Sequence, residues 1–325
     1  MIAAATVVLG LVLLIGGGTA MVHGASQAAI KLGWSPVVIG LTIVGFGTSA
    51  PELVVSLVAA AEGVSEIVFG NVIGSNICNI GLVLGLAALL APLQIHDQLV
   101  RRELPLLLLG SAAILVMALD DFLFSTVPTI NAIESIILLL LFAGFLYMTA
   151  IGLRNTRQTG SALRSDIEHS HIMDTATPSN YWWLTMAAGF ALLFLGGKVT
   201  VDGSVALAEL LGVSSAIIGL FVVAVGTSLP ELVTSAVAAM RGESDLAVGN
   251  VVGSNIFNGL FVLPASGLIS NVDVPEGGVA DVLVSMAFAI LLVSVFYLCK
   301  ARIGRVMGVM LLLCYASYTL IRISN

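Results

Sequence analysis

The sequence predicts an all-α membrane protein with ten transmembrane helices, arranged as two inverted five-helix repeats. The first observation is composition: 58% of the 325 residues are hydrophobic, 10% are charged, and mean hydropathy is +1.10, far outside soluble norms. The second is a series of apolar runs long enough for helices to cross a bilayer. The third is an internal duplication, in which residues 40–79 return at 219–258 with 24 of 40 positions identical.

The apolar runs place the ten predicted helices along the chain. They are continuous, whereas the strands of a membrane β-barrel would alternate apolar and polar residues. The predicted helices cover residues 2–30, 36–61, 66–90, 104–120, 127–153, 180–211, 215–240, 246–270, 278–299 and 303–322.

Five predicted helices lie on each side of the one extended polar stretch. Because five is odd, the second set enters the membrane from the opposite face, which gives an inverted repeat of the kind found in secondary transporters. We therefore expect a first five-helix repeat at 1–153, a linker at 154–179 and a second, inverted repeat at 180–325.

The basic residues indicate the orientation, since Lys and Arg accumulate in cytoplasmic loops. With both the N-terminus and the C-terminus outside, ten of the twelve basic residues fall in inside connections, the linker among them. We therefore expect a multi-pass protein of the cell membrane with a cytoplasmic linker. No basic patch with interleaved aromatics suggests nucleic acid, so the expected partner is the lipid bilayer, with no nucleic acid and no obligate protein partner.

Each copy of the duplication carries a carboxylate inside an apolar segment: Glu52 in GTSAPE and Glu231 in GTSLPE. An ionisable side chain at membrane depth is costly and marks a candidate functional site. The glycine and proline of each motif interrupt the helix, which a membrane tolerates only inside protein or beside a hydrated cavity. Thr48 and Glu52 share a helix face with Ser49 beside them, and the second copy repeats this set as Thr227, Ser228 and Glu231.

A second pair of segments carries stripes of polar residues at i, i+4 and i+8. Hydroxyl and amide oxygens of this kind suit Na⁺ and Ca²⁺, so we expect the two motifs and the two stripes to enclose one cation site. The stripes are Asn71, Ser75 and Asn79 in the first copy and Asn250, Ser254 and Asn258 in the second. Asn71 and Asn250 are ligand candidates of second rank, as are Asn76 and Asn255, which lie one residue off each stripe and are placed to hydrogen-bond between helices.

The GTSAPE and GTSLPE motifs resemble the two alpha-repeats of the cation/calcium exchanger superfamily, in its prokaryotic Na⁺/Ca²⁺ exchanger-like branch. The resemblance implies that Glu52 and Glu231 bind Ca²⁺ together with backbone oxygens of Thr48 and Thr227. It also implies that Na⁺ binds at Ser49, Ser228, Ser75 and Ser254 and at the backbone carbonyls of Gly45 and Ala224, with Asn79 and Asn258 lining the site. Some members of the superfamily carry an acid at one or both of these last two positions, where this chain has Asn.

The expected function is secondary active antiport of Na⁺ against Ca²⁺ by alternating access, electrogenic at three Na⁺ per Ca²⁺. From the resemblance, the long first and sixth helices slide against the remaining helices. Na⁺ and Ca²⁺ are then transported substrates, with no cofactor. No enzymatic activity is expected, because the H-E-x-x-H and serine-hydrolase patterns are absent.

Other coupling schemes stay open at this point. A buried Glu can accept a proton in place of a cation, so a proton-coupled exchanger is the main alternative, and K⁺ dependence is another. The proton-coupled branch resembles a GN-x-x-E pattern, whereas here Gly70 and Asn71 are followed by Val72, Ile73 and Gly74. A passive cation channel is a further alternative, although a compact two-acid site favours an occluded ion.

Overall fold

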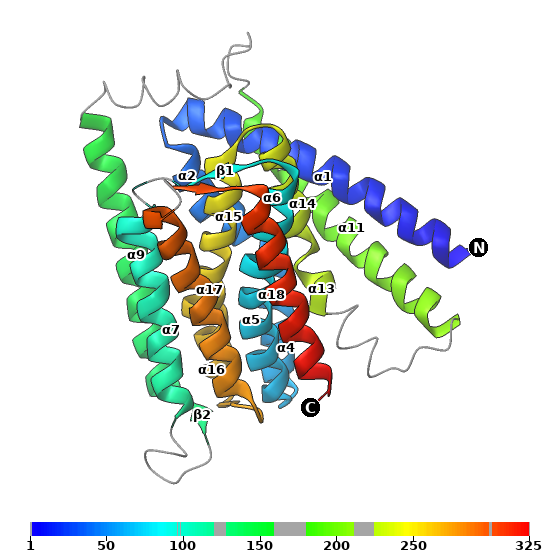
Figure 1. Ribbon diagram of the computed structural model, residues 1–325, viewed down its shortest axis with the longest axis vertical. Coiled ribbons are helices and arrows are strands. Elements are labelled where there is room, and N and C mark those ends of the chain that lie inside the picture. The colour runs from blue at the N-terminus through cyan, green and yellow to red at the C-terminus, as the bar shows by residue number, and fades with distance from the viewer. Residues whose placement is uncertain are drawn as a thin grey trace.

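The computed structural model describes an all-helical bundle crossed by one long pair of helices (Figure 1). The described residues are 2–95, 97, 99–119, 128–158, 180–210, 224–298 and 301–324. Their apolar side chains form one continuous buried cluster, and many large apolar side chains face outward as well. Such an apolar exterior is what a bilayer requires of a membrane protein.

The first copy of the duplication lies in the amino-terminal half. Several of its helices contain a π-helical turn, written η. The elements are α1 (Ile2–Leu32), α2 (Pro36–Ile39), η1 (Gly40–Val44), α3 (Gly45–Thr48), α4 (Ala50–Ala61), α5 (Ser65–Cys78), η2 (Asn79–Leu84), α6 (Gly85–Leu90), η3 (Leu99–Glu103), α7 (Leu104–Ala118) and α9 (Ala132–Gln158).

The carboxy-terminal half repeats the same order where it is described. Its elements are α11 (Trp182–Leu210), α13 (Ala224–Thr227), α14 (Leu229–Met240), α15 (Ser244–Phe257), η5 (Asn258–Val262), α16 (Leu263–Gly267), α17 (Gly278–Leu298) and α18 (Arg305–Ser324). The positions of η2 and η5 differ by the repeat offset, since Asn79 and Asn258 begin them.

The described helices account for most of the predicted spans. Seven are long and apolar enough to cross a membrane, and the bent pair Pro36–Thr48 and Ala50–Ala61 makes an eighth. Of the other two predictions, 104–120 is found as a helix of 15 residues, and 215–240 falls partly outside the described residues. The linker predicted at 154–179 begins as helix, because α9 continues to Gln158, and residues 159–179 lie outside the described part.

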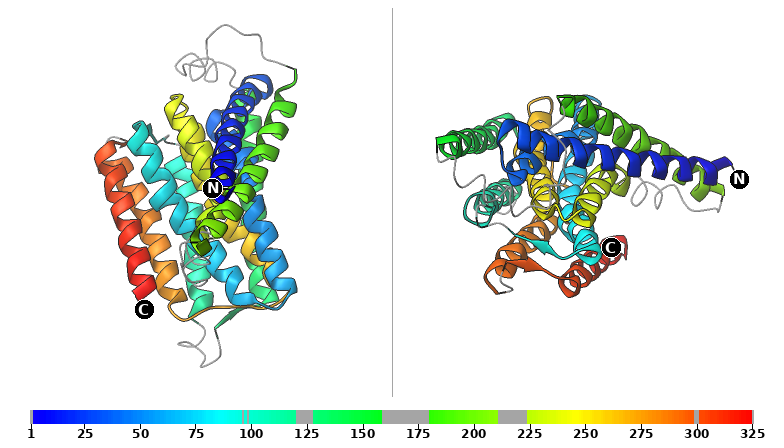
Figure 2. Two further views of the ribbon diagram at one scale, coloured as in Figure 1. Left: turned by 90° about the vertical axis from the view of Figure 1, so that its right-hand side faces the viewer. Right: turned by 90° about the horizontal axis from the view of Figure 1, so that it is seen from above.

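The helices α1 and α11 are the longest elements and run side by side away from the bundle (Figures 1 and 2). Small residues allow this close approach. A Cβ at Gly17 would meet the backbone of Leu193, and a Cβ at Gly189 would meet the backbone of Met21. The two helices contact each other far more extensively than either contacts the bundle, so they form a distinct packing unit.

The second predicted span is broken at its centre, as its glycines and proline predict. The axis bends by 44° between Pro36–Thr48 and Ala50–Ala61, and Ser49 at the break has φ −85° and ψ 9°. The next helix starts at once, with Pro51 in its first turn, where a missing N–H costs nothing. Ser228 has nearly the same dihedrals, −86° and 5°, before α14. Both copies therefore begin a new helix just before the acid.

Two short antiparallel sheets connect the halves at opposite ends of the bundle (Figure 1). One pairs β1 (Leu93–Gln94) with β4 (Arg302–Ile303). The other pairs β2 (Thr129–Ile130) with β3 (Val272–Asp273). The sequence analysis expected loops at Leu93–Gln94 and Val272–Asp273 but included Thr129–Ile130 and Ile303 in predicted helices, which is wrong at these three residues. Two-residue strands lack a detectable alternation of apolar and polar residues, so no local pattern indicated them. Each sheet fixes a loop of one half against a loop of the other.

Candidate cation site

The two motif acids lie fully buried at the centre of the bundle. Glu52 and Glu231 are 0% exposed, and each occupies the first turn of a twelve-residue helix, α4 or α14. The amino-terminal end of a helix carries partial positive charge, which stabilises a carboxylate there. The breaks at Ser49 and Ser228 therefore place both acids at electrostatically favourable positions deep in the protein.

Each acid accepts a hydrogen bond from the serine of the opposite motif. The Ser49 hydroxyl donates to Oε1 of Glu231 at 2.8 Å, and the Ser228 hydroxyl donates to Oε1 of Glu52 at 3.3 Å. These crossed bonds bring the two motifs, 179 residues apart in sequence, into one site.

The stripe serines approach the same oxygens from α5 and α15. Ser75 lies 3.5 Å from Oε1 of Glu52, and Ser254 lies 3.4 Å from Oε1 of Glu231. The Ser254 hydroxyl also lies 3.3 Å from the backbone carbonyl of Gly45. The structure thus gathers both acids, the four serines and the Gly45 carbonyl in one region.

The second oxygen of each carboxylate is buried and lacks a protein donor among the described residues. Oε2 of Glu52 and Oε2 of Glu231 have no hydrogen-bond partner among the described residues. Leaving a buried charged acceptor unsatisfied is costly. A bound cation would satisfy both oxygens, so this pair is the strongest indication that the site holds a positively charged ligand.

Thr48 joins the motif of the first copy to the stripe of the second. Its hydroxyl donates to Oδ1 of Asn250 at 3.1 Å and lies 3.4 Å from the Ser254 hydroxyl. Its repeat counterpart Thr227 is half-buried at the end of α13. Ala224 begins α13, where its backbone matches that of Gly45 by the repeat offset.

The second-rank residues Asn71 and Asn250 serve the helices that carry the acids. The Asn71 amide donates to the backbone carbonyl of Glu52 at 3.1 Å and to the Ser56 hydroxyl at 2.9 Å. Asn250 makes the equivalent bonds to the Glu231 carbonyl at 3.5 Å and to Ser235 at 2.9 Å. These amides therefore position the acids through the backbone.

The sequence analysis did not single out Ser56 and Ser235, the partners of these amides. Both are buried, and both occupy matched positions in the duplication. A polar residue repeated at an otherwise apolar segment was the signal that would have identified them.

Asn76 and Asn255 connect α5 to α15, in agreement with the expected interhelical role. The Asn255 amide donates to the carbonyl of Asn76 at 3.1 Å, and the Asn76 amide reaches the carbonyl of Asn255 at 3.4 Å. Asn79 donates to Oδ1 of Asn255 at 2.9 Å. The Oδ1 of Asn79 and both amide atoms of Asn258 lack partners among the described residues. Asn79 and Asn258 are the first residues of the π-helical turns η2 and η5. Such turns are frequent at functional sites.

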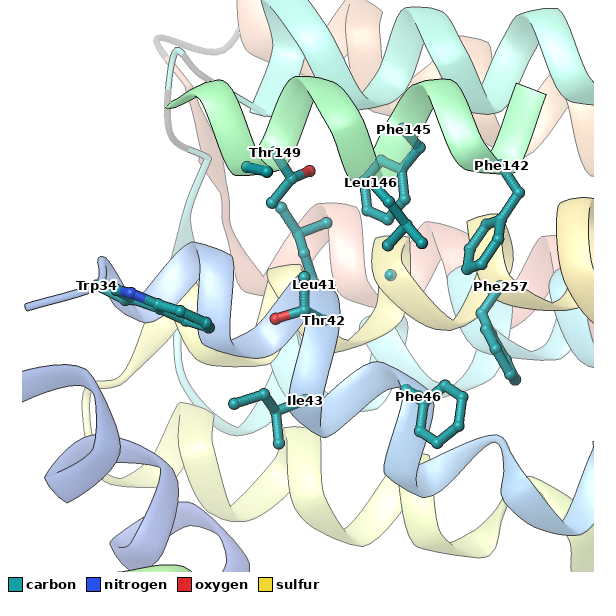
Figure 3. A pocket seen from close by; sticks show the side chains of 12 residues that line it. Trp34, Leu41, Thr42, Ile43, Phe46, Phe142, Phe145, Leu146, Thr149 and Phe257 are labelled. Carbon is teal, nitrogen blue, oxygen red and sulfur yellow. The ribbon is translucent and has the colours of Figure 1, made fainter. Parts of the chain in front are cut away.

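An apolar pocket lies beside the site but presents it no charged group. Its volume is 460 Å³, and it separates α9 from the helices of the second span (Figure 3). Phe46 and Phe257 meet there edge to face at 4.7 Å between ring centroids. The pocket contacts the outer face of the broken helix, while the candidate ligands lie on its inner face.

The donor set of the site consists of hard oxygen ligands. Among the described residues no three His, Cys, Asp or Glu side chains gather as they would for a transition-metal centre. The oxygens present are carboxylate, hydroxyl, amide and carbonyl, which are the hard ligands preferred by Na⁺ and Ca²⁺. The fold and this inventory define an all-helical membrane protein with a buried, oxygen-lined site.

Comparison with known proteins identifies the family. The model of the sodium/calcium exchanger protein family matches residues 2–151 and 181–324. The sodium/calcium exchanger MaX1 of Methanosarcina acetivorans is 35% identical over 338 residues, covering 96% of each chain. The inner membrane protein YrbG of Escherichia coli is 35% identical over 320 residues, covering 96% of this chain and 94% of YrbG.

A solved structure shows the same fold. The sodium-calcium exchanger NCX_Mj, soaked without Na⁺ and Ca²⁺, superposes with a TM-score of 0.80 at 31% identity, covering 97% of this chain and 96% of that chain. The chain belongs to the sodium/calcium exchanger family. It is therefore a multi-pass membrane protein that exchanges Ca²⁺ for another cation. It is a transporter and not an enzyme, and the exchanged ions are its substrates.

Proposed function

We propose that this antiporter exchanges Na⁺ for Ca²⁺ at the site between Glu52 and Glu231. The observation that carries the proposal is the pair of buried carboxylates, each with one oxygen lacking a partner among the described residues. Two carboxylates balance the charge of one Ca²⁺ or two Na⁺. The same oxygens can therefore serve either ion in turn, as exchange requires.

The proposed ligand roles follow the positions of the oxygens. Ca²⁺ binds both carboxylates together with the backbone oxygens of Thr48 and Thr227. Na⁺ binds at the serines and at neighbouring carbonyls, with the two open amides lining the site. The Na⁺ ligands are Ser49, Ser75, Ser228 and Ser254 with the backbone carbonyls of Gly45 and Ala224, and the lining amides are Asn79 and Asn258.

The proposed architecture has ten spans in two inverted repeats, 1–153 and 180–325, joined by a cytoplasmic linker at 154–179, with both termini outside. The hydrogen bonds related by the 179-residue offset support it, as does the likeness to NCX_Mj. Alternating access then moves α1 and α11 as a unit, because these helices pack mainly on one another.

The proposed exchange moves three Na⁺ against one Ca²⁺ and is electrogenic. One net charge then crosses the membrane per cycle. Moving it through the full potential is worth about 2.3 kcal/mol per 100 mV, so a negative interior would assist Ca²⁺ extrusion.

Uptake of ⁴⁵Ca²⁺ into proteoliposomes tests the proposal. Liposomes loaded with Na⁺ should accumulate Ca²⁺, with a rate that depends on voltage, and Glu52→Gln or Glu231→Gln should reduce uptake about 100-fold or more, since each removes a buried charge from the site. Glu66→Gln is the matched control, because Glu66 is an exposed acid at the start of α5.

The alternatives give different results in the same assay. Uptake driven by a proton gradient would favour the proton-coupled exchanger, and a requirement for K⁺ would favour the K⁺-dependent one. Flux independent of any gradient would indicate a channel. Full activity in both glutamine variants would contradict the site itself.

A further inference from the structure

The groove between α17 and α18 lies on the outside of the bundle, away from the oxygen site. α17 packs on α5 and α7, whereas α18 packs on α6 and η2, and the two helices stand apart when seen from above (Figure 2). Phe288 of α17 and Tyr315 of α18 both lie against Gly81, where an added Cβ would contact each side chain. Between the two helices is an open groove of 760 Å³, which Phe288 lines.

The walls of the groove are apolar over most of its length. Val284, Ala287 and Leu291 line it from α17, and Leu313 and Ile321 line it from α18. Leu313 and Ile321 are 61% and 59% exposed, so the groove opens to the surroundings of the protein. At membrane depth those surroundings are hydrocarbon, so the groove favours an acyl chain.

One end of the groove carries a partly buried ion pair. Arg322 donates through Nη2 to Oδ2 of Asp281 at 3.1 Å, and Tyr318 donates to Oδ1 of the same carboxylate at 2.8 Å. The Asp281 side chain is only 12% exposed, whereas the Arg322 side chain is 36% exposed. The arginine is therefore the partner that can also contact a ligand from outside.

The charges at this end fit a headgroup that has both signs. Arg322 donates through Nη2 to Asp281 and to the Glu276 carbonyl, and because a guanidinium carries five N–H donors in all, it has further donors of a kind suited to a phosphate. The positive end of α17 at Gly278 adds to this preference. The side chain of Glu276 is exposed on the same bend, and it offers a carboxylate to an ammonium group.

We propose that the α17–α18 groove binds a zwitterionic phospholipid with a primary ammonium headgroup, of the phosphatidylethanolamine type. Its phosphate contacts Arg322, its ammonium lies beside Glu276, and one acyl chain follows the groove. The lining residues of α17 run from Ala280 to Leu291, which is about 17 Å of helix at 1.5 Å per residue. That length accommodates an acyl chain within one leaflet of a hydrocarbon core about 30 Å thick.

Native mass spectrometry of the detergent-purified protein tests the proposal. The wild type should retain dioleoyl-phosphatidylethanolamine in preference to dioleoyl-phosphatidylglycerol. Arg322→Gln should weaken retention about tenfold, because it removes a charge-assisted hydrogen bond to the phosphate. Arg305→Gln, at the other end of α18, is the matched control and should retain the lipid.

A second variant and a second readout distinguish loss of lipid binding from misfolding of the Arg322→Gln variant. Ala287→Phe fills the groove and should lower retention of every lipid, with size-exclusion profiles confirming folding. Cys314 also lines the groove and is exposed, so its alkylation by N-ethylmaleimide, measured by peptide mass spectrometry, should slow when phosphatidylethanolamine is added. Equal retention of both lipids, unchanged binding in Arg322→Gln, or protection of Cys314 that depends on protein concentration alone would overturn the proposal, the last by indicating a second copy in the groove.

Discussion

The surroundings of Glu52 and Glu231 are built from the same residues, yet their geometry differs. Glu231 accepts its crossed hydrogen bond at 2.8 Å from Ser49, whereas Glu52 accepts the equivalent bond at 3.3 Å from Ser228. The amide network differs too. The side-chain amide of Asn79 donates to Asn255, whereas the side-chain amide of Asn258 has no partner among the described residues. A repeated sequence therefore adopts two unequal local structures. An exchanger requires such inequality, since a symmetric site would face both sides alike.

Among variants that keep both acids, removal of the crossed serines should have the largest effect, and it tests the difference between the two acids directly. Ser49→Ala should lower the apparent Na⁺ affinity about 30-fold, because it loses the short hydrogen bond to a carboxylate and a proposed ligand. Ser228→Ala should lower it about threefold, because its bond is longer. The measurement is the Na⁺ dependence of ⁴⁵Ca²⁺ uptake.

Ser294→Ala supplies the control for this pair, since among the described residues Ser294 donates to the carbonyl of Ile290 within α17, away from the site. Equal losses in Ser49→Ala and Ser228→Ala would show that the unequal distances have no energetic meaning.

The two open amides should separate stability from transport. Asn79→Ala loses a buried hydrogen bond and should cost about 1 kcal/mol of stability as well as transport. Asn258→Ala loses no protein hydrogen bond among the described residues, so it should lower uptake about tenfold with little change in thermal stability. The measurements are uptake and the melting temperature of the purified protein. Destabilisation of both variants to the same degree would mean that Asn258 has a structural role like that of Asn79.

A pH effect at the edge of the bundle should be the smallest. Glu243, in the turn between α14 and α15, accepts a hydrogen bond from Ser26 of α1 at 3.1 Å, and burial raises the pKa of Glu243 above its ordinary value. The folded protein therefore binds this proton more tightly than the unfolded chain does, so acidification favours the folded state at Glu243, while the Ser26 hydrogen bond itself favours the ionised carboxylate. The contribution of Glu243 to the free energy of unfolding is fully present below the ordinary carboxyl pKa, and it is lost as pH rises through the raised pKa of Glu243.

Glu243→Gln should thus flatten the pH dependence of uptake on the acidic side of neutrality, by about twofold. The first copy has Val64 at the equivalent position, so no matching effect is expected there, and Glu62→Gln is a suitable control because Glu62 is exposed. If Glu243→Gln left the pH profile of uptake unaltered, the proposed role of Glu243 in the pH dependence would be wrong.

Much of the architecture could be predicted because the membrane makes sequence unusually informative. A carboxylate such as Glu52 in an apolar segment has few acceptable surroundings, so the sequence predicts that the motifs and polar stripes share one region, and the structure brings their side chains together there. The stagger of Asn76 from the stripe also predicted its bonds between helices.

Other features depend on tertiary contacts that no local pattern encodes. The bond from Ser49 crosses to the other copy, and the strands Leu93–Gln94 and Arg302–Ile303 pair only because two distant loops meet. The π-helical turn at Asn79 likewise has no signature in propensity. The inequality between the two acids could not be predicted at all, because the two motifs are nearly the same sequence.

The two small sheets have a consequence for how the chain is assembled. β1 with β4 and β2 with β3 each join one half to the other, and the Asn76 and Asn255 pair does the same at the centre. The facing surfaces of the two halves thus carry information that brings them together. Two genes, each encoding one half, should accordingly complement each other when expressed in the same cell.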